Sequence, residues 1–316
     1  MTTSVRTSDL VAQRLRGRKL RLGSVIFESL LLLTLLTALG ILVVLLADII
    51  AGAIPVFRDR GLDFVTSGLS LSGDSAGVSS AIVGSIGLTV IVALIAFPLG
   101  IGAAVYLEEY APDTRVSRIF RTNIRNLAGV PSIVYGLLGL AVMVRLVDIV
   151  GLGGPGTTNG RNVVAAGLTM SLLVLPIVII TASEALRAVP STIREAGFGV
   201  GATRWETIRH HVLPSAAPGI LTGTILALAR AFGETAPLLL IGVATGFFSV
   251  GADTGLLERA TGTYTALPVV VFSWSRQPVE GFQENLAPAA IVVLLVVLFT
   301  ANATAIVLRN RYERKW

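Results

Sequence analysis

Long apolar runs separated by short polar segments dominate the chain. A run of about 20 apolar residues, at about 1.5 Å per residue in a helix, crosses roughly 30 Å of hydrocarbon. We therefore predict an all-α polytopic membrane protein with six transmembrane helices. The predicted spans are Val25–Ala51, Ser79–Leu107, Ile124–Val147, Val163–Leu186, Ala216–Val243 and Leu286–Leu308.

One further apolar stretch, Ala266–Trp274, is too short to cross a bilayer. We expect it to be a re-entrant or interfacial piece. A seventh span at this point would move the C-terminus to the outer side, which the distribution of charge opposes.

Most of the 25 Lys and Arg residues fall in four segments on one predicted side. These are Arg6, Arg14, Arg16, Arg18, Lys19 and Arg21; Arg115, Arg118, Arg121 and Arg125; Arg187, Arg194, Arg204 and Arg209; and Arg309, Arg311, Arg314 and Lys315. Because basic residues are retained in the cytoplasm, we predict that both termini and the segment near Arg204 are cytoplasmic. Membrane orientation thus accounts for the net charge of +6. The sequence contains no basic stripe with interleaved aromatic residues, so we do not predict nucleic-acid binding.

Composition narrows the chemistry of the chain. It is 53% hydrophobic and 14% charged, with a mean hydropathy of +0.80. The absence of cysteine excludes disulfides, thiolate metal sites and cysteine nucleophiles. The only histidines, His210 and His211, are adjacent, so we predict no metal site within the chain. No Walker-type phosphate loop is present, so ATP hydrolysis, if it drives the protein, belongs to another polypeptide.

The N-terminal residues are basic and precede an apolar run that is too long for a signal peptide, so we predict an uncleaved first helix. The expected organisation has four parts. These are a cytoplasmic basic arm at 1–23, a first transmembrane helix with its outer loop at 24–78, a permease core at 79–308 and a cytoplasmic tail at 309–316.

The polar stretch Ser191–Pro214 reads as two short helices joined by a turn. The pairs Thr192–Glu195 and Thr203–Glu206 have the spacing of capping boxes. Glycines between them permit a chain reversal, and Pro214 is expected to stop the second helix. Trp205, Ile208 and Val212 share one face of that helix. We predict a basic helical hairpin with an apolar ridge, which favours docking over covalent chemistry.

The fifth span contains Arg230 and Glu234, which are four residues apart and therefore share a helical face. Charges in a bilayer are costly and usually face a protein interior or an aqueous path. A guanidinium suits phosphate or carboxylate oxygens. The pair is consistent either with an anion path or with a structural salt bridge between packed helices. In the third span, Asn126 and Ser132 are the candidate path residues.

The hairpin resembles the EAA loop of ABC-importer permeases, which docks into a groove of a cytoplasmic ATPase. The residues that carry the resemblance are Glu195, Ala196, Gly197, Gly201, Leu213 and Pro214. One departure is His211, where the family has an apolar residue; Val212 is expected to serve instead. The resemblance implies that the hairpin, including Trp205 and Ile208, couples the spans to the ATPase.

Two further stretches, Asn126–Leu140 and Ala229–Leu239, resemble the phosphate-specific importer permeases, the second being closer to PstA than to its sister PstC. The resemblance implies a type I, MetI-like permease core in a bacterial inner membrane. It also implies a PstC-like sister permease as heterodimer partner, a PstB-like ATPase dimer that uses ATP and Mg²⁺, and a PstS-like phosphate-binding protein outside. The chain itself is expected to bind no cofactor and to catalyse no reaction.

Three alternatives remain open at this point. The substrate of an ABC permease with this sequence could be another oxyanion, such as sulfate or molybdate. An ion-coupled secondary transporter often shows internal repeats, which we do not find here, and would leave the charged hairpin without a purpose. If the protein were a membrane scaffold without transport, the free-energy cost of placing Arg230 and Glu234 in the bilayer would have no explanation.

Overall fold

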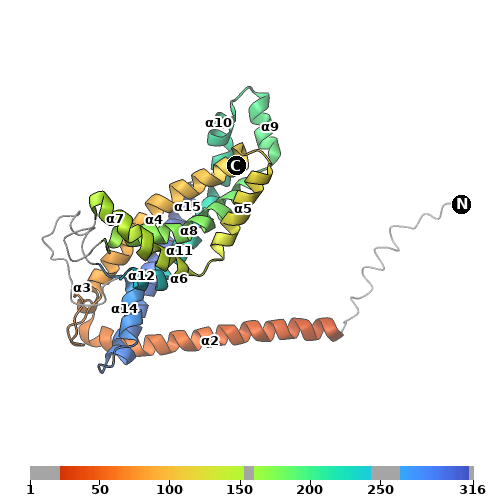
Figure 1. Ribbon diagram of the computed structural model, residues 1–316. Coiled ribbons are helices and arrows are strands. Elements are labelled where there is room, and N and C mark those ends of the chain that lie inside the picture. Colours follow the sequence, from red (N-terminus) through yellow and green to blue (C-terminus); the bar gives the residue numbers. More distant parts are fainter. Residues whose placement is uncertain (1–21, 153–159, 243–263, 313–316) are drawn as a thin grey trace. The chain divides into compact units, whose positions relative to one another are not determined.

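The computed structural model describes residues 22–152, 160–242 and 264–312, and every secondary-structure element in these ranges is helical. This confirms the predicted all-α class (Figure 1). The chain divides into two compact units, Met1–Ile49 and Ile50–Trp316. In the first unit the structure describes the beginning of α2 (Leu22–Arg60). Nearly all of the predicted basic arm lies outside the described residues.

Within the described residues, six helical segments are long and apolar enough to cross a membrane, which agrees with the predicted number. They are Gly23–Arg60, Ser79–Tyr110, Ser132–Leu152, Val163–Arg187, Arg204–Gly233 and Phe282–Arg311. The second, fourth and sixth agree with the prediction to within a few residues at each end. The first extends well beyond the predicted end at Ala51, and the third and fifth begin elsewhere. The division at residues 24, 79 and 309 stays a prediction.

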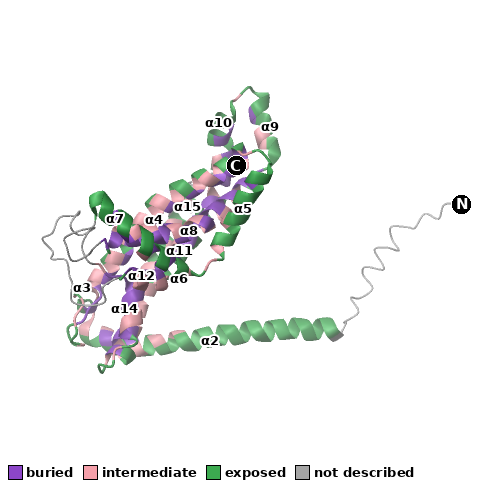
Figure 2. Cartoon of the chain, in the orientation of Figure 1, coloured by how far each residue is buried: buried purple, intermediate pink, exposed green. Residues whose placement is uncertain are grey.

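The second unit is organised around α8 (Val163–Arg187), which packs against α4 (Ser79–Val105) and α11 (Leu213–Gly233). Figure 2 shows that α8 is the most continuously buried of the long helices. Its sequence is apolar on nearly all faces, which is the pattern of a helix surrounded by other helices. Close packing depends on small residues: a Cβ on Gly100 would come within 2.6 Å of Val178.

The predicted third span, Ile124–Val147, is wrong at its start. The chain forms an amphipathic helix, α5 (Arg115–Ala128), and breaks before α6 (Ser132–Leu138). Pro131 is the reason, because it lacks a backbone N–H and disfavours helical geometry in the residue before it. Tyr135 bridges the break by donating a hydrogen bond from its Oη to the Leu127 carbonyl at 2.9 Å. The span itself is Ser132–Leu152.

Three short elements complete that span. A π-helical turn η2 (Gly139–Met143), α7 (Val144–Val147) and a second π-helical turn η3 (Asp148–Leu152) follow α6 without leaving the helical path until Gly151. A glycine allows close approach of two helices here, since a Cβ on Gly136 would come within 2.7 Å of Pro237 Cα.

The predicted fifth span, Ala216–Val243, is wrong at both ends. Pro214 does not stop a helix; it lies in the first turn of α11, where a missing N–H costs little. A π-helical turn η4 (Ile208–Val212) carries the chain from α10 (Arg204–Thr207) directly into α11. Val243 lies outside the described residues.

At its other end, α11 stops at Gly233. Glu234 follows with extended backbone angles, φ −79° and ψ 123°, before the short helix α12 (Ala236–Ile241). The helix is therefore completely broken between Gly233 and Ala236.

The stretch that was too short to span forms α14 (Leu267–Trp274), an eight-residue helix that is largely buried. It packs on α15 (Ala287–Tyr312), which follows a π-helical turn η5 (Phe282–Leu286). Trp274 stands between Phe64 and Phe282, with ring centroids 6.2 and 5.6 Å away. Phe64 comes from α3 (Asp63–Thr66), a short helix between the first two spans.

Candidate functional site: a helical hairpin and its arginine network

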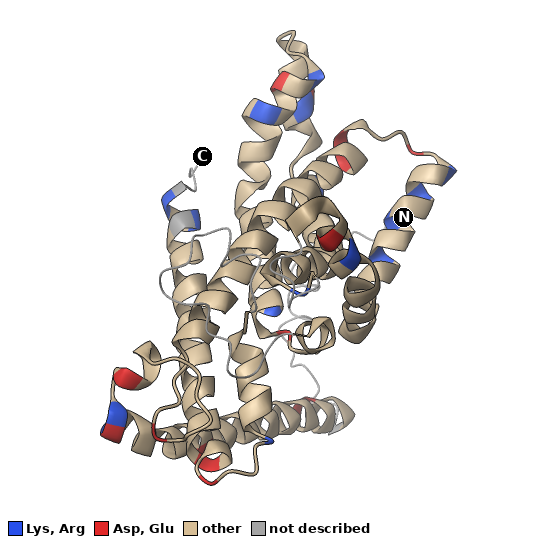
Figure 3. Ribbon diagram, turned by 60° about the vertical axis from the view of Figure 1, so that its left-hand side comes forward, with Lys and Arg blue, Asp and Glu red and all other residues tan. Residues whose placement is uncertain are grey.

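The hairpin predicted at Ser191–Pro214 is present, built from α9 (Ser191–Gly199) and α10. It projects from one end of the helices around α8 (Figure 1). We call this end of the second unit the hairpin end. Charged residues gather along α5, in the hairpin and near helix ends, while the middles of the long helices are mostly uncharged (Figure 3).

One of the two predicted capping boxes is confirmed. Thr203 Oγ1 accepts a hydrogen bond from the Glu206 N–H at 3.3 Å, and the Thr203 N–H donates to Glu206 Oε2 at 2.8 Å. The other, Thr192–Glu195, is wrong. α9 begins directly after Pro190, whose side chain has no cap acceptor, so Thr192 falls inside the first helical turn.

The chain reversal between the helices depends on two glycines. Gly197 is buried, and a Cβ there would come within 2.7 Å of the Thr207 side chain on α10. Gly201 has a φ of +83°, a conformation that side chains with a Cβ disfavour. The turn was predicted from these glycines, and the structure confirms it.

The predicted apolar ridge is divided between two environments. Ile208 and Val212 are buried, with exposures of 1% and 0%, whereas Trp205 is 51% exposed. Ile208 therefore stabilises the hairpin from within and does not present a contact surface. Val212 is buried beneath the hairpin and His211 is exposed, so the buried apolar position is that of Val212; its role in coupling stays a prediction.

The other residues of the predicted coupling set lie on or near the surface. Glu195 and Ala196 on α9 are exposed, as is Pro214, and Leu213 is partly buried against the core beneath the hairpin. The exposed apolar residues Phe198 and Val200 stand at the tip beside them. Sequence reasoning missed this pair, although their position next to the turn glycines is the signal that could have identified them.

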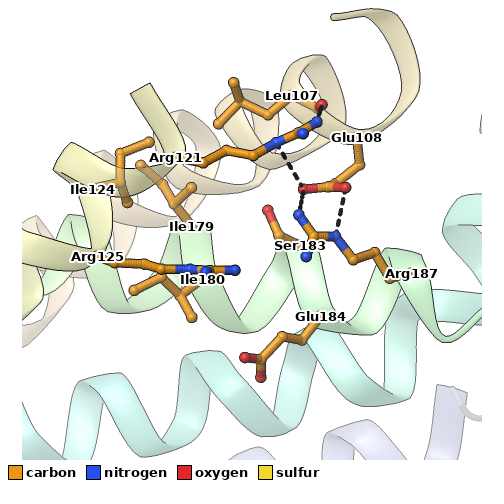
Figure 4. A pocket seen from close by; sticks show the side chains of 10 residues that line it. All are labelled: Leu107, Glu108, Arg121, Ile124, Arg125, Ile179, Ile180, Ser183, Glu184 and Arg187. Atoms are coloured by element: carbon orange, nitrogen blue, oxygen red, sulfur yellow. Dashed lines mark hydrogen bonds and ion pairs between the residues drawn. The ribbon is translucent and has the colours of Figure 1, made fainter. Parts of the chain in front are cut away.

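Beneath the hairpin lies an ion-pair network that the sequence did not reveal. α4 continues into a π-helical turn, η1 (Tyr106–Tyr110), which carries two adjacent acids. Glu108 forms two hydrogen bonds with Arg187, at 2.7 and 2.8 Å, and lies 3.8 Å from Arg121 Nε on α5 (Figure 4). Glu184, the acid nearer to Arg187 in the sequence, is exposed and does not form the ion pair with it. The partner of Arg187 is instead distant in the sequence.

The second acid, Glu109, reaches the hairpin itself. Its carboxylate accepts three hydrogen bonds from the guanidinium of Arg194 on α9, the shortest being 2.6 Å. The Glu109 side chain is 6% exposed and that of Arg194 is 24% exposed. The Arg194–Glu109 contact is charge-assisted and forked, and it is largely shielded from solvent, so it is strong and directional.

The predicted Arg230–Glu234 pair is formed, with Arg230 Nε 3.3 Å from Glu234 Oε1. The pair lies across the break at the end of α11, and the two side chains are 48% and 20% exposed. It is therefore not sealed between packed helices of this chain.

The other two candidate path residues do not join this pair in the described residues. Asn126 is exposed on α5, before the break, and Ser132 is partly buried in the first turn of α6. Neither forms a hydrogen bond with Arg230 or Glu234 within the described ranges. They remain predictions without a shared site.

Solved structures with a similar fold come from ABC transporters. One is the crystal structure of a bacterial alginate ABC transporter in complex with an alginate-bound periplasmic protein, with a TM-score of 0.59 and 17% identity over 92% of this chain and 96% of that one. Another is an inward-facing form of the MetNI methionine ABC transporter, with a TM-score of 0.52 and 16% identity over 75% and 96%. The fold is therefore that of a type I, MetI-like ABC-importer permease.

Residues 96–315 match the family described as "Binding-protein-dependent transport system inner membrane component", and the chain belongs to that family. Among named relatives, PstA 1 of Mycobacterium tuberculosis (strain CDC 1551 / Oshkosh) is 33% identical over 74% of this chain and 71% of its own length. PstA of Xylella fastidiosa (strain 9a5c) is 32% identical over 79% and 82%. Both are named phosphate transport system permease proteins. The probable ABC transporter permease YqgI of Bacillus subtilis (strain 168) is 33% identical over 63% of this chain and 66% of its own length.

Proposed function

We propose that this chain is a permease subunit of an ATP-driven phosphate importer and forms half of its translocation pathway. The observation that carries the proposal is the Arg230–Glu234 pair at the break of the fifth span. The relatives named as PstA phosphate permeases direct the proposal toward phosphate.

The chemistry of Arg230 suits a passing oxyanion. A guanidinium keeps its charge at any physiological pH and can donate two parallel hydrogen bonds to adjacent oxygens. Glu234 holds the side chain from one edge, through Nε. The partial exposure of Arg230 leaves its guanidinium open to an approaching anion, while the neighbouring carboxylate moderates the attraction, so that the anion can also leave.

The hairpin is the proposed coupling element. Its exposed face, formed by Glu195, Ala196 and Trp205 with the tip residues Phe198 and Val200, would dock onto a PstB-like ATPase that binds ATP and Mg²⁺. Closure of the ATPase dimer would push on this face. Because α10 continues through η4 into α11 without a break, the push would reach the Arg230 end of the same helix.

The remaining partners follow from the family. A PstC-like sister permease would supply the other half of the path, and a PstS-like receptor would deliver phosphate from outside. We place both termini and the hairpin on the cytoplasmic side of a bacterial inner membrane, following the distribution of Lys and Arg. Phosphate would pass chemically unchanged.

Another tetrahedral oxyanion, such as sulfate or molybdate, would also fit a single guanidinium. The Arg230–Glu234 pair has no group that would distinguish a protonated oxyanion such as phosphate from an unprotonated one. Competition separates these substrates. Phosphate uptake that is suppressed by excess phosphate but not by equal sulfate or molybdate is the expected result.

The test of the proposed function is uptake of labelled phosphate into proteoliposomes. The complex of this chain with a sister permease, the ATPase and the receptor should accumulate phosphate when ATP is supplied, and should not do so when the ATPase is omitted. Uptake by this chain alone, without ATP, would contradict the proposal and favour a secondary transporter.

A further inference from the structure

The hairpin is joined by the backbone to only two of the spans. α9 follows α8 and α10 leads into α11, so any movement of the hairpin reaches these helices directly. The second span, α4 with η1, ends more than 80 residues earlier in the sequence and has no such covalent connection. Side chains alone can link it to the hairpin.

Arg194 provides this link and is bonded in several directions at once. Besides its three hydrogen bonds to Glu109, it donates from Nη2 to the Leu186 carbonyl at 3.0 Å and from Nη1 to the Val189 carbonyl at 2.9 Å. These carbonyls lie at and just beyond the end of α8, where backbone acceptors lack helical partners. One guanidinium of the hairpin therefore binds both the end of the second span and the end of the fourth span.

A second contact lies beside the first. The guanidinium of Arg204, at the start of α10, stands 5.2 Å from the ring centroid of Tyr110, the residue after Glu109. Both helices of the hairpin thus contact η1. The tight approach of Gly197 to Thr207 packs the two hairpin helices directly against each other.

We propose that Arg194 is a positioning residue that attaches the second span to the coupling hairpin through Glu109, so that the second, fourth and fifth spans respond together to the ATPase. The inference rests on the proposed function, and it adds a span and a residue pair to the coupling path. Burial explains why the Arg194–Glu109 pair would stay intact when the ATPase moves the hairpin. A carboxylate that is only 6% exposed cannot easily exchange its partner for water, so separating the pair leaves an unpaired charge.

The experiment compares Glu109→Gln and Arg194→Gln with a matched control, Asp113→Asn. Asp113 also pairs with an arginine, Arg118, but at 3.7 Å and with both side chains largely exposed. In the reconstituted complex we measure phosphate uptake, ATP hydrolysis and the amount of assembled complex. The expected result is a ratio of uptake to hydrolysis about tenfold lower in both variants, in the range of ordinary allosteric coupling energies, and unchanged in Asp113→Asn.

A purely structural role would give a different pattern, in which less complex assembles but each assembled complex keeps the wild-type ratio. That result would overturn the inference while leaving the proposed function intact. Failure of the wild-type complex to take up phosphate with ATP would instead contradict the proposed function itself. Arg194→Lys, which keeps the charge but loses the fork, provides a variant with a milder effect on folding and should also lower the ratio.

Direct distance measurement gives a second readout. Because the chain has no cysteine, it adds no background labelling, and two spin labels can be placed at exposed positions outside the proposed docking face: Tyr106→Cys on η1 and Thr192→Cys on α9. In the complex, the distance distribution should stay narrow through the ATP cycle and broaden with Glu109→Gln. A distribution that is equally narrow with and without Glu109→Gln would also overturn the inference.

Discussion

Gly197 and Thr207 are packed so closely that a Cβ on the glycine would lie 2.7 Å from the threonine side chain. The two residues come from the two helices of the hairpin, and both are buried. This contact sets the spacing of α9 and α10. It also explains a glycine inside a helix, where glycine is otherwise unfavourable.

Replacing Gly197 with Ala should therefore loosen the hairpin. Overpacking of this kind costs about 1–3 kcal/mol, and hydrogen exchange of the α9 and α10 amides should report it as lost protection. Gly199→Ala is the control, because no atom lies within 4 Å of a Cβ at that position. Equal protection in the two variants would show that the close contact does not hold the helices.

The capping box gives a second matched pair of substitutions. Thr203→Ala removes the acceptor for the Glu206 N–H and should destabilise the start of α10 by about 0.5–2 kcal/mol. Thr192→Ala should have little effect, because Thr192 does not cap α9. Tryptic cleavage after Arg204 in the purified chain measures the difference. Faster cleavage in Thr192→Ala than in Thr203→Ala would contradict the assignment.

Trp205 and Ile208 should separate docking from stability. Ile208→Ala leaves a cavity in a buried position and should lower the free energy of unfolding by about 2–5 kcal/mol. Trp205→Ala removes a half-exposed side chain and should instead weaken retention of the ATPase when the complex is purified in mild detergent. Thermal unfolding and co-purification are measured on both variants; a Trp205 variant that unfolds early yet retains the ATPase would reverse the assignment.

Arg230→Leu should abolish phosphate uptake without preventing assembly. The substitution removes the positive charge at the break of the fifth span, and the side chain is exposed enough for the chain to fold without it. Arg118→Leu on α5, which is also exposed, should leave uptake near the wild-type level. Uptake that survives Arg230→Leu would mean that the pair is a structural salt bridge.

The sequence by itself determined the membrane class, the number of spans and the existence of the hairpin. Apolar runs of bilayer length have few other solutions, because backbone groups in lipid must be satisfied within a helix. The Arg230–Glu234 pair and the Thr203–Glu206 cap were also readable, since their partners are separated by four and three positions along one local segment.

Only the tertiary structure decided which contacts form between distant segments. Pro131 and Pro214 look alike as helix breakers, but one separates α5 from α6 and the other lies in the first turn of α11. Arg187 pairs with Glu108 and not with Glu184, which is nearer in the sequence, and Arg194 pairs with Glu109. Helix packing brings these charges together at the hairpin end of the second unit. Local periodicity in the sequence carries no information on pairings between distant residues. The folded structure does, because it gives the burial of Glu109 and its distance to Arg194.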